Sequence, residues 1–230
     1  MAGKEQGKDW DLSKYFLQIA LGMHVCSIYR NKEEQLSVII PYLIFGLKHN
    51  ERCVYVIGEN TKEDICRLLN ESGIRSNSYI QSGQLVFLNK EDTYLREGFF
   101  APQRMLDLVE NAHYEALRDG HYGLRGTGEM SWVLEELPGS DKLIDYESKI
   151  NQIFPRKKMA VICQYDETKF PENVLLEVLH THPKVIIYGT VYENPHYISA
   201  DEFADHLEYK YPPGTYQKLR DNIINSQALN

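Results

Sequence analysis

From residue 24 onward, the chain alternates short runs of β-branched and aromatic residues with longer stretches of helical periodicity. The first unit is a run at residues 24–29, a helical stretch that begins after Asn31 and extends to Lys48, and a second run at residues 53–57. Such alternation is typical of crossover units, in which a helix connects two parallel strands. The sequence therefore predicts an α/β fold with a mostly parallel central sheet and helices on both faces.

Residues that begin or end helices divide the rest of the chain in the same way. Thr61 and Pro102 are placed to begin helices, Ser140 to cap one that runs to Phe154, and Pro171 to open another. The polar and aromatic stretch 89–101 reads as a long loop, and loops of that length are often functional. Further strands are predicted at residues 85–88, 123–127, 159–165, 185–188 and 190–192, the last two as a hairpin-like edge.

The length of the chain sets its domain organisation. With 230 residues, of which 43% are hydrophobic, it can bury one sizeable core, and no internal repeat or Ser/Gly-rich linker divides it. We expect a helical extension at residues 1–23, one domain at residues 24–198 and a second helical extension at residues 199–230.

Charge and hydropathy exclude several classes of protein. The formal net charge is −8 and the basic residues are scattered, so no basic stripe could neutralise a nucleic-acid backbone. The longest apolar stretch, residues 37–47, contains Pro41 and is too short to span a bilayer. The four cysteines are too widely spaced for a CxxC pair. We expect a cytoplasmic protein that binds neither nucleic acid nor membrane directly.

The carboxyl ends of the predicted strands carry the residues suited to a ligand site. In an open parallel sheet, ligands bind outside these ends, where the strand order reverses. Aromatic side chains can stack on a planar or halogenated group while charged ones orient it. The plainer alternative is that the aromatic residues only cover the core. The strand-end residues are Tyr29, Arg30, Glu59, Asn60, Glu129, Trp132, Tyr165 and Asp166.

The first strand-to-helix loop lacks the features of a phosphate-binding loop. Residues 27–34 contain no glycine, and Glu33 and Glu34 would repel phosphate at the start of the helix. We expect no ATP hydrolysis and no cofactor, and keep as an alternative a nucleotide held in an unusual mode.

Metal binding and catalysis have weaker signals. His180, His182 and the pair His24 and Cys26 are typical ligand types, but the HxH spacing is more typical of a helix end, so no metal site is expected. Nucleophilic catalysis has less support still, because Cys163 lies in a strand that is predicted to be buried. Glu129 and Asp166 could act as an acid/base pair or could be paired with Arg125 or Arg30. We predict no catalytic residue and no enzyme activity.

Several stretches together resemble the MEDS domain, the methanogen/methylotroph DcmR-like sensory family. The most specific are Gly-Glu-Met-Ser-Trp at residues 128–132 and Tyr-Glu-Asn-Pro at residues 192–195. The others lie at residues 24–29, 55–60, 93–95, 123–127, 146–147, 163–166 and 180–183. The resemblance covers residues 24–198.

This resemblance implies a RecA/KaiC-like core without a working Walker A loop, in a family proposed to sense hydrocarbon derivatives. Family members are often fused to DNA-binding or histidine-kinase modules, neither of which fits in the remaining residues. We therefore expect a small-molecule sensor that acts through a separate kinase or transcription regulator, or through self-association as a homo-oligomer. A degenerate nucleotide-binding module is the alternative. Strand ends and motifs together predict a ligand site of Tyr29, Arg30, Glu59, Asn60, Tyr94, Arg125, Glu129, Trp132, Tyr165 and Asp166.

Overall fold

Seven strands form one sheet at the centre of the computed structural model, which describes residues 19–206 and 211–227. The strands are β1 (His24–Tyr29), β2 (Arg52–Val56), β3 (Leu85–Leu88), β4 (Leu124–Glu129), β5 (Met159–Asp166), β6 (Lys184–Ile187) and β7 (Thr190–Glu193). Their order is β3-β2-β4-β5-β1-β6-β7, and every pairing is parallel except the antiparallel pair of β6 and β7. Tyr188 and Gly189, which join this pair, both have positive φ, as the twist of a two-residue hairpin requires.

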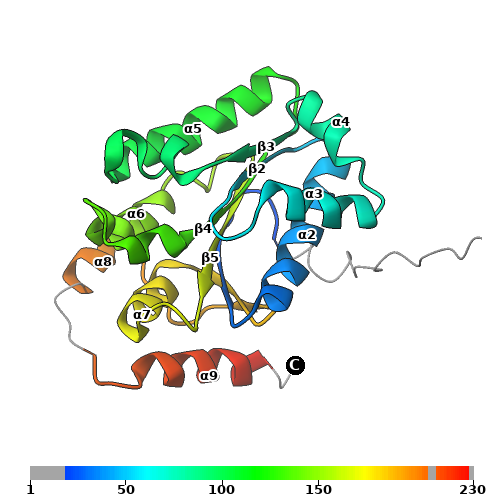
Figure 1. Ribbon diagram of the computed structural model, residues 1–230. Coiled ribbons are helices and arrows are strands. Elements are labelled where there is room, and N and C mark those ends of the chain that lie inside the picture. Colours follow the sequence, from blue (N-terminus) through cyan, green and yellow to red (C-terminus); the bar gives the residue numbers. More distant parts are fainter. Residues whose placement is uncertain (1–18, 207–210, 228–230) are drawn as a thin grey trace, which may run out of the picture.

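Helices cover both faces of the sheet (Figure 1). One face carries α2 (Lys32–Lys48), α3 (Lys62–Glu71) and α4 (Ser76–Gln81). The other carries α5 (Pro102–Arg118), α6 (Leu143–Ile150), α7 (Glu172–Thr181) and α9 (Thr215–Gln227), and α8 (Ala200–His206) packs against α6. The short 3-10 turns are η1 (Lys90–Asp92), η2 (Arg96–Gly98), η3 (Met130–Glu135) and η4 (Ser140–Lys142). The predicted α/β class, with a mostly parallel sheet covered on both sides, is confirmed.

The direction of the chain explains which helix lies on which face. The chain moves from β1 to β2 to β3 toward one edge of the sheet, and then returns through β4, β5 and β6. Because parallel crossovers are right-handed, the connecting helices change face when the direction reverses. Loops that follow β1 and β2 therefore leave toward one face and loops that follow β4 and β5 toward the other, which opens a crevice at their carboxyl ends.

Local sequence signals account for several of the helix starts. The side chain of Asn31 accepts a hydrogen bond from the backbone of Glu34, and Thr61 does the same for Asp64. The predicted cap at Ser140 was wrong: that residue begins η4, while α6 starts at Leu143 without a side-chain cap and ends at Ile150, short of Phe154. The sequence analysis did not predict α4. The stretch 89–101, which was predicted to be a long loop, contains the short 3-10 turns η1 and η2.

The two predicted extensions differ in how far they can be described. The helical extension expected at residues 1–23 falls mostly outside the described residues. At the other end, α8 and α9 lie within the region predicted to be helical, and α9 packs against α7 and β7. None of the helices in the described part of the chain combines the length and the apolar character needed to cross a membrane.

Candidate functional site

The carboxylate of Glu129, at the end of β4, holds the loop that follows β2. Its Oε1 accepts hydrogen bonds from the Tyr55 hydroxyl at 2.8 Å and from Asn60 Nδ2 at 3.1 Å. Its Oε2 accepts from the backbone N–H groups of Glu59 at 2.7 Å and Asn60 at 3.3 Å. Glu129 is buried, so these donors replace the water that would otherwise solvate its charge.

A chain of buried amides extends this network across one face of the sheet. Asn60 donates to Gln35 on α2 at 3.0 Å, Gln35 to Gln164 on β5 at 2.8 Å, and Gln164 to the hydroxyl of Thr127 on β4 at 2.8 Å. The Thr127 hydroxyl then donates to the carbonyl of Ile162 at 2.9 Å. Connected buried networks of this kind favour one arrangement of the elements that they join. The sequence analysis did not identify Gln35 or Gln164.

The outer part of the crevice is charged and more exposed. Lys169 bridges two predicted residues: its Nζ lies 2.5 Å from a carboxylate oxygen of Glu59 and 3.4 Å from Asp166. Arg30 pairs with Glu34 and lies over the Tyr188 ring, with 3.8 Å between its Cζ and the ring centroid. These ion pairs are too exposed to stabilise the fold much.

Tyr29 and a shallow hollow complete this edge. Burial, together with the nearby carboxylates of Glu129 and Asp166, raises the pKa of Tyr29, so its hydroxyl stays protonated. The hollow has a volume of about 400 Å³ and is rich in glutamates. Its lining includes Glu59, Glu91, Glu129, Glu135, Lys90 and Trp132. Negative charge on this scale disfavours an anionic ligand.

Two of the predicted site residues lie elsewhere. Arg125 is the second residue of β4, at the amino end of the strand, where it is buried and paired with Glu51. Its side chain packs on the face covered by α2, over the rings of Tyr42 and Phe45. Tyr165 is near the carboxyl end of β5, but its hydroxyl points under α6 and donates to Glu147 at 2.5 Å. Tyr165, which the strand-end rule selected, and Arg125, which the motif positions added, therefore do not join the other predicted residues at this edge.

Tyr94 and Trp132 belong to a buried aromatic cluster. Their rings stack with centroids 5.0 Å apart, and Phe100 contacts Trp132 at 4.9 Å and Tyr146 at 5.7 Å. Tyr94 and Phe100 come from the long loop at residues 89–101, while Trp132 lies in η3, directly after Glu129. The cluster therefore ties the predicted functional loop to the polar network.

An apolar cavity of about 210 Å³ lies on the other side of Tyr94, between α5 and the sheet. Gly126 and Gly128 on β4 leave room for it, and a side chain at position 128 would collide with the Tyr94 hydroxyl. The few polar residues in its lining include Arg52, Glu115 and Thr127. The apolar lining comprises Val54, Val56, Val86, Leu88, Met105, Leu108, Val109, Ala112, Leu124, Tyr146, Val161 and Cys163. The sequence analysis identified only Tyr94 among these cavity residues.

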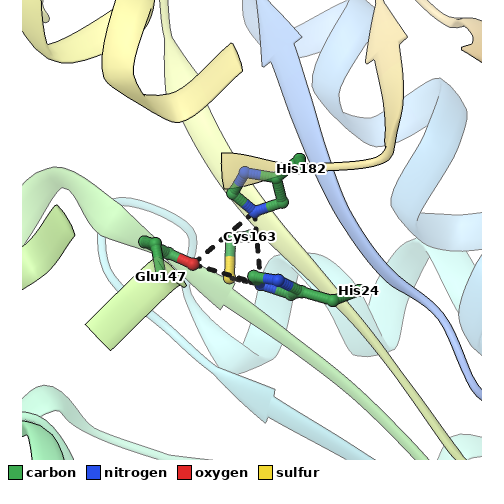
Figure 2. A group of neighbouring side chains, drawn as sticks. All are labelled: His24, Glu147, Cys163 and His182. Carbon is green, nitrogen blue, oxygen red and sulfur yellow. Dashed lines mark hydrogen bonds and ion pairs between the residues drawn. The ribbon is translucent and has the colours of Figure 1, made fainter. Parts of the chain in front are cut away.

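A second group of side chains lies beside this cavity. Among the described residues, His24, Glu147, Cys163 and His182 bring their potential ligand atoms within 4.8 Å of one another, and all four are buried (Figure 2). The sequence analysis had weighed His24 and His182 as metal ligands, together with Cys26 and His180, which are not members of this group. Glu147 and Cys163 were missed in that role, although both lie in stretches that carry the family resemblance.

Comparisons with known proteins agree with this architecture. Residues 23–183 match the family model described as MEDS, the methanogen/methylotroph, DcmR sensory domain. The transcriptional repressor DcmR of Methylorubrum extorquens is 27% identical over 177 residues, which are 75% of this chain and 62% of that repressor. The chain thus spans less than two thirds of its relative. A KaiC-like protein from Pyrococcus horikoshii has a similar fold, with a TM-score of 0.50 and 14% identity over 73% of this chain and 71% of that one.

Proposed function

The chain belongs to the MEDS family of sensory domains, and on that premise we propose that it binds a small apolar molecule in the cavity beneath α5 and signals its presence without transforming it. The observation that carries this proposal is the cavity itself, whose walls are almost entirely aliphatic and aromatic. A hydrocarbon or a halogenated hydrocarbon fits such walls, because it needs few hydrogen-bond partners and gains from leaving water.

The size of the cavity supports a small ligand. Its volume of about 210 Å³ is somewhat larger than that of an engineered apolar cavity of about 150 Å³ that stays dry and takes up benzene or xenon. The Tyr94 hydroxyl lies at the wall of the cavity, and we find no hydrogen-bond partner for it among the described residues. It could donate to a ligand that carries one halogen or oxygen atom.

The same residue offers a way to report that the cavity is filled. Tyr94 lines the cavity and stacks on Trp132, which follows Glu129 and hence adjoins the network that holds Glu59 and Asn60. A ligand that displaces the Tyr94 ring would change the packing of η3 and of the carboxyl edge. A ligand can shift the equilibrium between these two arrangements of η3 and the carboxyl edge only as far as its affinities for the two arrangements differ. We propose that this exposed edge contacts a separate regulator or a second copy of the chain.

Two features argue against the alternative of a nucleotide site. At the start of α2, the backbone N–H of Glu34 already donates to Asn31, and that of Arg30 donates to the Glu34 carboxylate. The amides that bind phosphate in a P-loop are therefore engaged by the chain's own side chains. The hollow at the carboxyl edge is also lined by several glutamates.

The proposed ligand site predicts that dichloromethane and benzene stabilise the protein. A ligand at one hundred times its dissociation constant adds about 2.7 kcal/mol to the free energy of unfolding. In thermal unfolding at increasing probe concentration, we expect a saturable rise in melting temperature. Ala112→Leu, which fills the cavity from α5, should weaken this response at least tenfold.

The matched control is Asn111→Leu, which adds a similar side chain at an exposed position of the same helix. It should respond as the wild type does. Equal responses of the two variants, or no saturable response of the wild type to either probe, would count against the cavity as the ligand site.

A separate prediction concerns nucleotides. Because the start of α2 offers no free phosphate-binding loop, we expect neither stabilisation by magnesium-ATP nor phosphate release above the rate of the buffer. Isothermal titration and a coupled phosphate assay check this. Saturable ATP binding that is lost on Glu129→Gln would instead favour the nucleotide-binding alternative.

A further inference from the structure

We propose that His24, Glu147, Cys163 and His182 form a buried, four-ligand site for a divalent transition metal ion of the zinc type. The four residues come from β1, α6, β5 and the end of α7, so an ion would join two helices to the central strands. This proposal does not require the cavity to bind a ligand.

The spacing of the ligand atoms fits one tetrahedral ion. His24 Nε2 lies 3.2 Å from His182 Nε2, 3.4 Å from Cys163 Sγ and 3.1 Å from Glu147 Oε2, and His182 Nε2 lies 3.5 Å from the same oxygen (Figure 2). Zinc bonds of ordinary length place two tetrahedral nitrogens about 3.3 Å apart, and a nitrogen and a sulfur about 3.6 Å apart. Small side-chain movements would bring all four atoms onto one ion.

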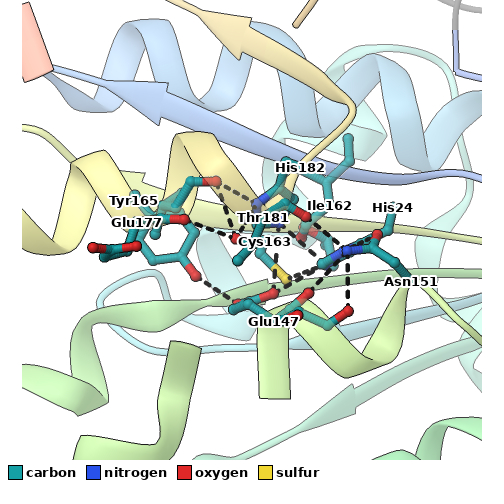
Figure 3. A network of polar contacts seen from close by, with 12 residues as sticks. His24, Glu147, Asn151, Ile162, Cys163, Tyr165, Glu177, Thr181 and His182 are labelled. Carbon is teal, nitrogen blue, oxygen red and sulfur yellow. Dashed lines mark hydrogen bonds and ion pairs between the residues drawn. The ribbon is translucent and has the colours of Figure 1, made fainter. Parts of the chain in front are cut away.

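The surrounding hydrogen bonds orient both imidazoles for this role (Figure 3). Asn151 Nδ2 donates to the backbone carbonyl of Thr181 at 2.7 Å, which turns its Oδ1 toward His24 Nδ1 at 3.1 Å. His182 Nδ1 lies 2.8 Å from the carbonyl of Val178. The tautomer with a proton on each Nδ1 satisfies both of these contacts, and in that tautomer both Nε2 lone pairs point into the cluster. Metal-bound histidines are usually held by such outer hydrogen bonds.

Glu147 gives the strongest support for a cation in this cluster. Its Oε1 accepts the hydrogen bond from Tyr165, whereas Oε2 is fully buried and has no hydrogen-bond partner among the described residues. Two imidazole lone pairs face this oxygen, so three electron-rich atoms converge away from water. Such an arrangement is costly unless a proton or a metal ion lies between them.

The donor set selects the class of ion. Two imidazoles, a thiol and one carboxylate suit zinc and neighbouring transition metals, whereas magnesium and calcium prefer oxygen ligands alone. Burial lowers the pKa of His182 to about 3, which keeps its imidazole in the neutral form that binds metals. Burial also raises the pKa of the Cys163 thiol, so binding would release a proton from it. Since the protein supplies all four ligands, the site would be structural.

The site touches the proposed ligand cavity at one residue. Cys163 contributes to the cluster and also lines the cavity wall. A bound ion would hold this wall in place. The two proposals can still fail separately, because metal content is measured without any apolar probe, and the response of Ala112→Leu is measured without changing a metal ligand.

The test compares metal content and cobalt spectra of three forms of the full chain. After reconstitution with Zn²⁺, we expect about one equivalent per chain by elemental analysis. With Co²⁺ we expect the intense visible bands of a tetrahedral ion and a thiolate-to-cobalt charge-transfer band. Cys163→Ala should lose the charge-transfer band and at least nine tenths of the tightly held ion. Cys26→Ala should keep both, since Cys26 is a buried thiol that pairs with Cys163 across adjacent strands but lies outside the cluster.

A second measurement remains decisive if Cys163→Ala fails to fold. The wild type should then unfold at a higher temperature with Zn²⁺ than after dialysis against a chelator. Less than a tenth of an equivalent of Zn²⁺ or Co²⁺ in the folded, reconstituted wild type would overturn the proposal. Retention of the charge-transfer band in folded Cys163→Ala would overturn it as well. Either result would leave a proton shared between the histidines and Glu147 as the cation of the cluster.

Discussion

Glu51→Gln is expected to lower the free energy of unfolding by about 3–5 kcal/mol, because it leaves the Arg125 guanidinium charged and unpaired in the interior. Arg125 and Glu51 are 1% and 3% exposed at their side chains, and they form an ion pair through Arg125 Nε. A second bond joins Arg125 Nη2 to Glu51 Oε1 at 3.3 Å. Denaturation in urea with linear extrapolation measures the loss.

Glu71→Gln is the matched control, because Glu71 forms an exposed pair with Arg67 on α3. It should leave the urea midpoint nearly unchanged. The comparison also decides between two roles for Arg125, which the sequence analysis placed in the ligand site. If Glu51→Gln kept full stability and lost only the response to dichloromethane, our structural interpretation of the pair would be wrong.

Glu129→Ala is expected to lower the free energy of unfolding by about 3 kcal/mol or more, because it leaves several buried or half-buried donors without an acceptor, at about 1–3 kcal/mol for each buried one. The donors are the Tyr55 hydroxyl, Asn60 Nδ2 and the backbone N–H groups of Glu59 and Asn60. Amide hydrogen exchange at Glu59 and Asn60 should accelerate together with the loss of stability.

Tyr55→Phe gives the graded comparison for Glu129. It removes one of these donors and leaves the carboxylate bound by the others, so its cost should be well below that of Glu129→Ala. A cost below about 1 kcal/mol for Glu129→Ala, with unchanged exchange at the two amides, would show that Glu129 does not anchor the loop.

The rule that ligands bind at the carboxyl ends of parallel strands selected several residues that do lie close together in the structure. The residues that lie elsewhere do so for simple reasons. The rule brought together Glu59, Asn60 and Glu129, because the ends of neighbouring parallel strands must meet at one edge. Arg125 was added from the motif positions and not by this rule, and it lies at the opposite end of its strand. The rule failed for Tyr165 because successive side chains of a strand point to opposite faces of the sheet. The Tyr165 side chain points to the face that α6 covers, where its hydroxyl bonds Glu147.

Other features had no local signal in the sequence. The amide chain from Asn60 through Gln35 to Gln164 joins residues that are 25 and 129 positions apart, so no motif could reveal it. The cluster of His24, Glu147, Cys163 and His182 draws on four separate elements, whereas motif spacing detects only ligands that share one. A pattern of β-branched residues predicts a buried strand. The apolar cavity beside these strands depends on how α5 packs against the sheet, which no local pattern reveals.

The most direct test of the proposed sensory function is a crystal structure of the wild type determined under xenon pressure. Xenon binds apolar cavities without needing a polar partner. We predict an ordered xenon atom between α5 and the sheet, in contact with Val54, Val109 and the ring of Tyr94, and its absence from that position in Ala112→Leu. Xenon bound only at other positions, or an unchanged site in Ala112→Leu, would contradict the claim that this cavity receives the ligand.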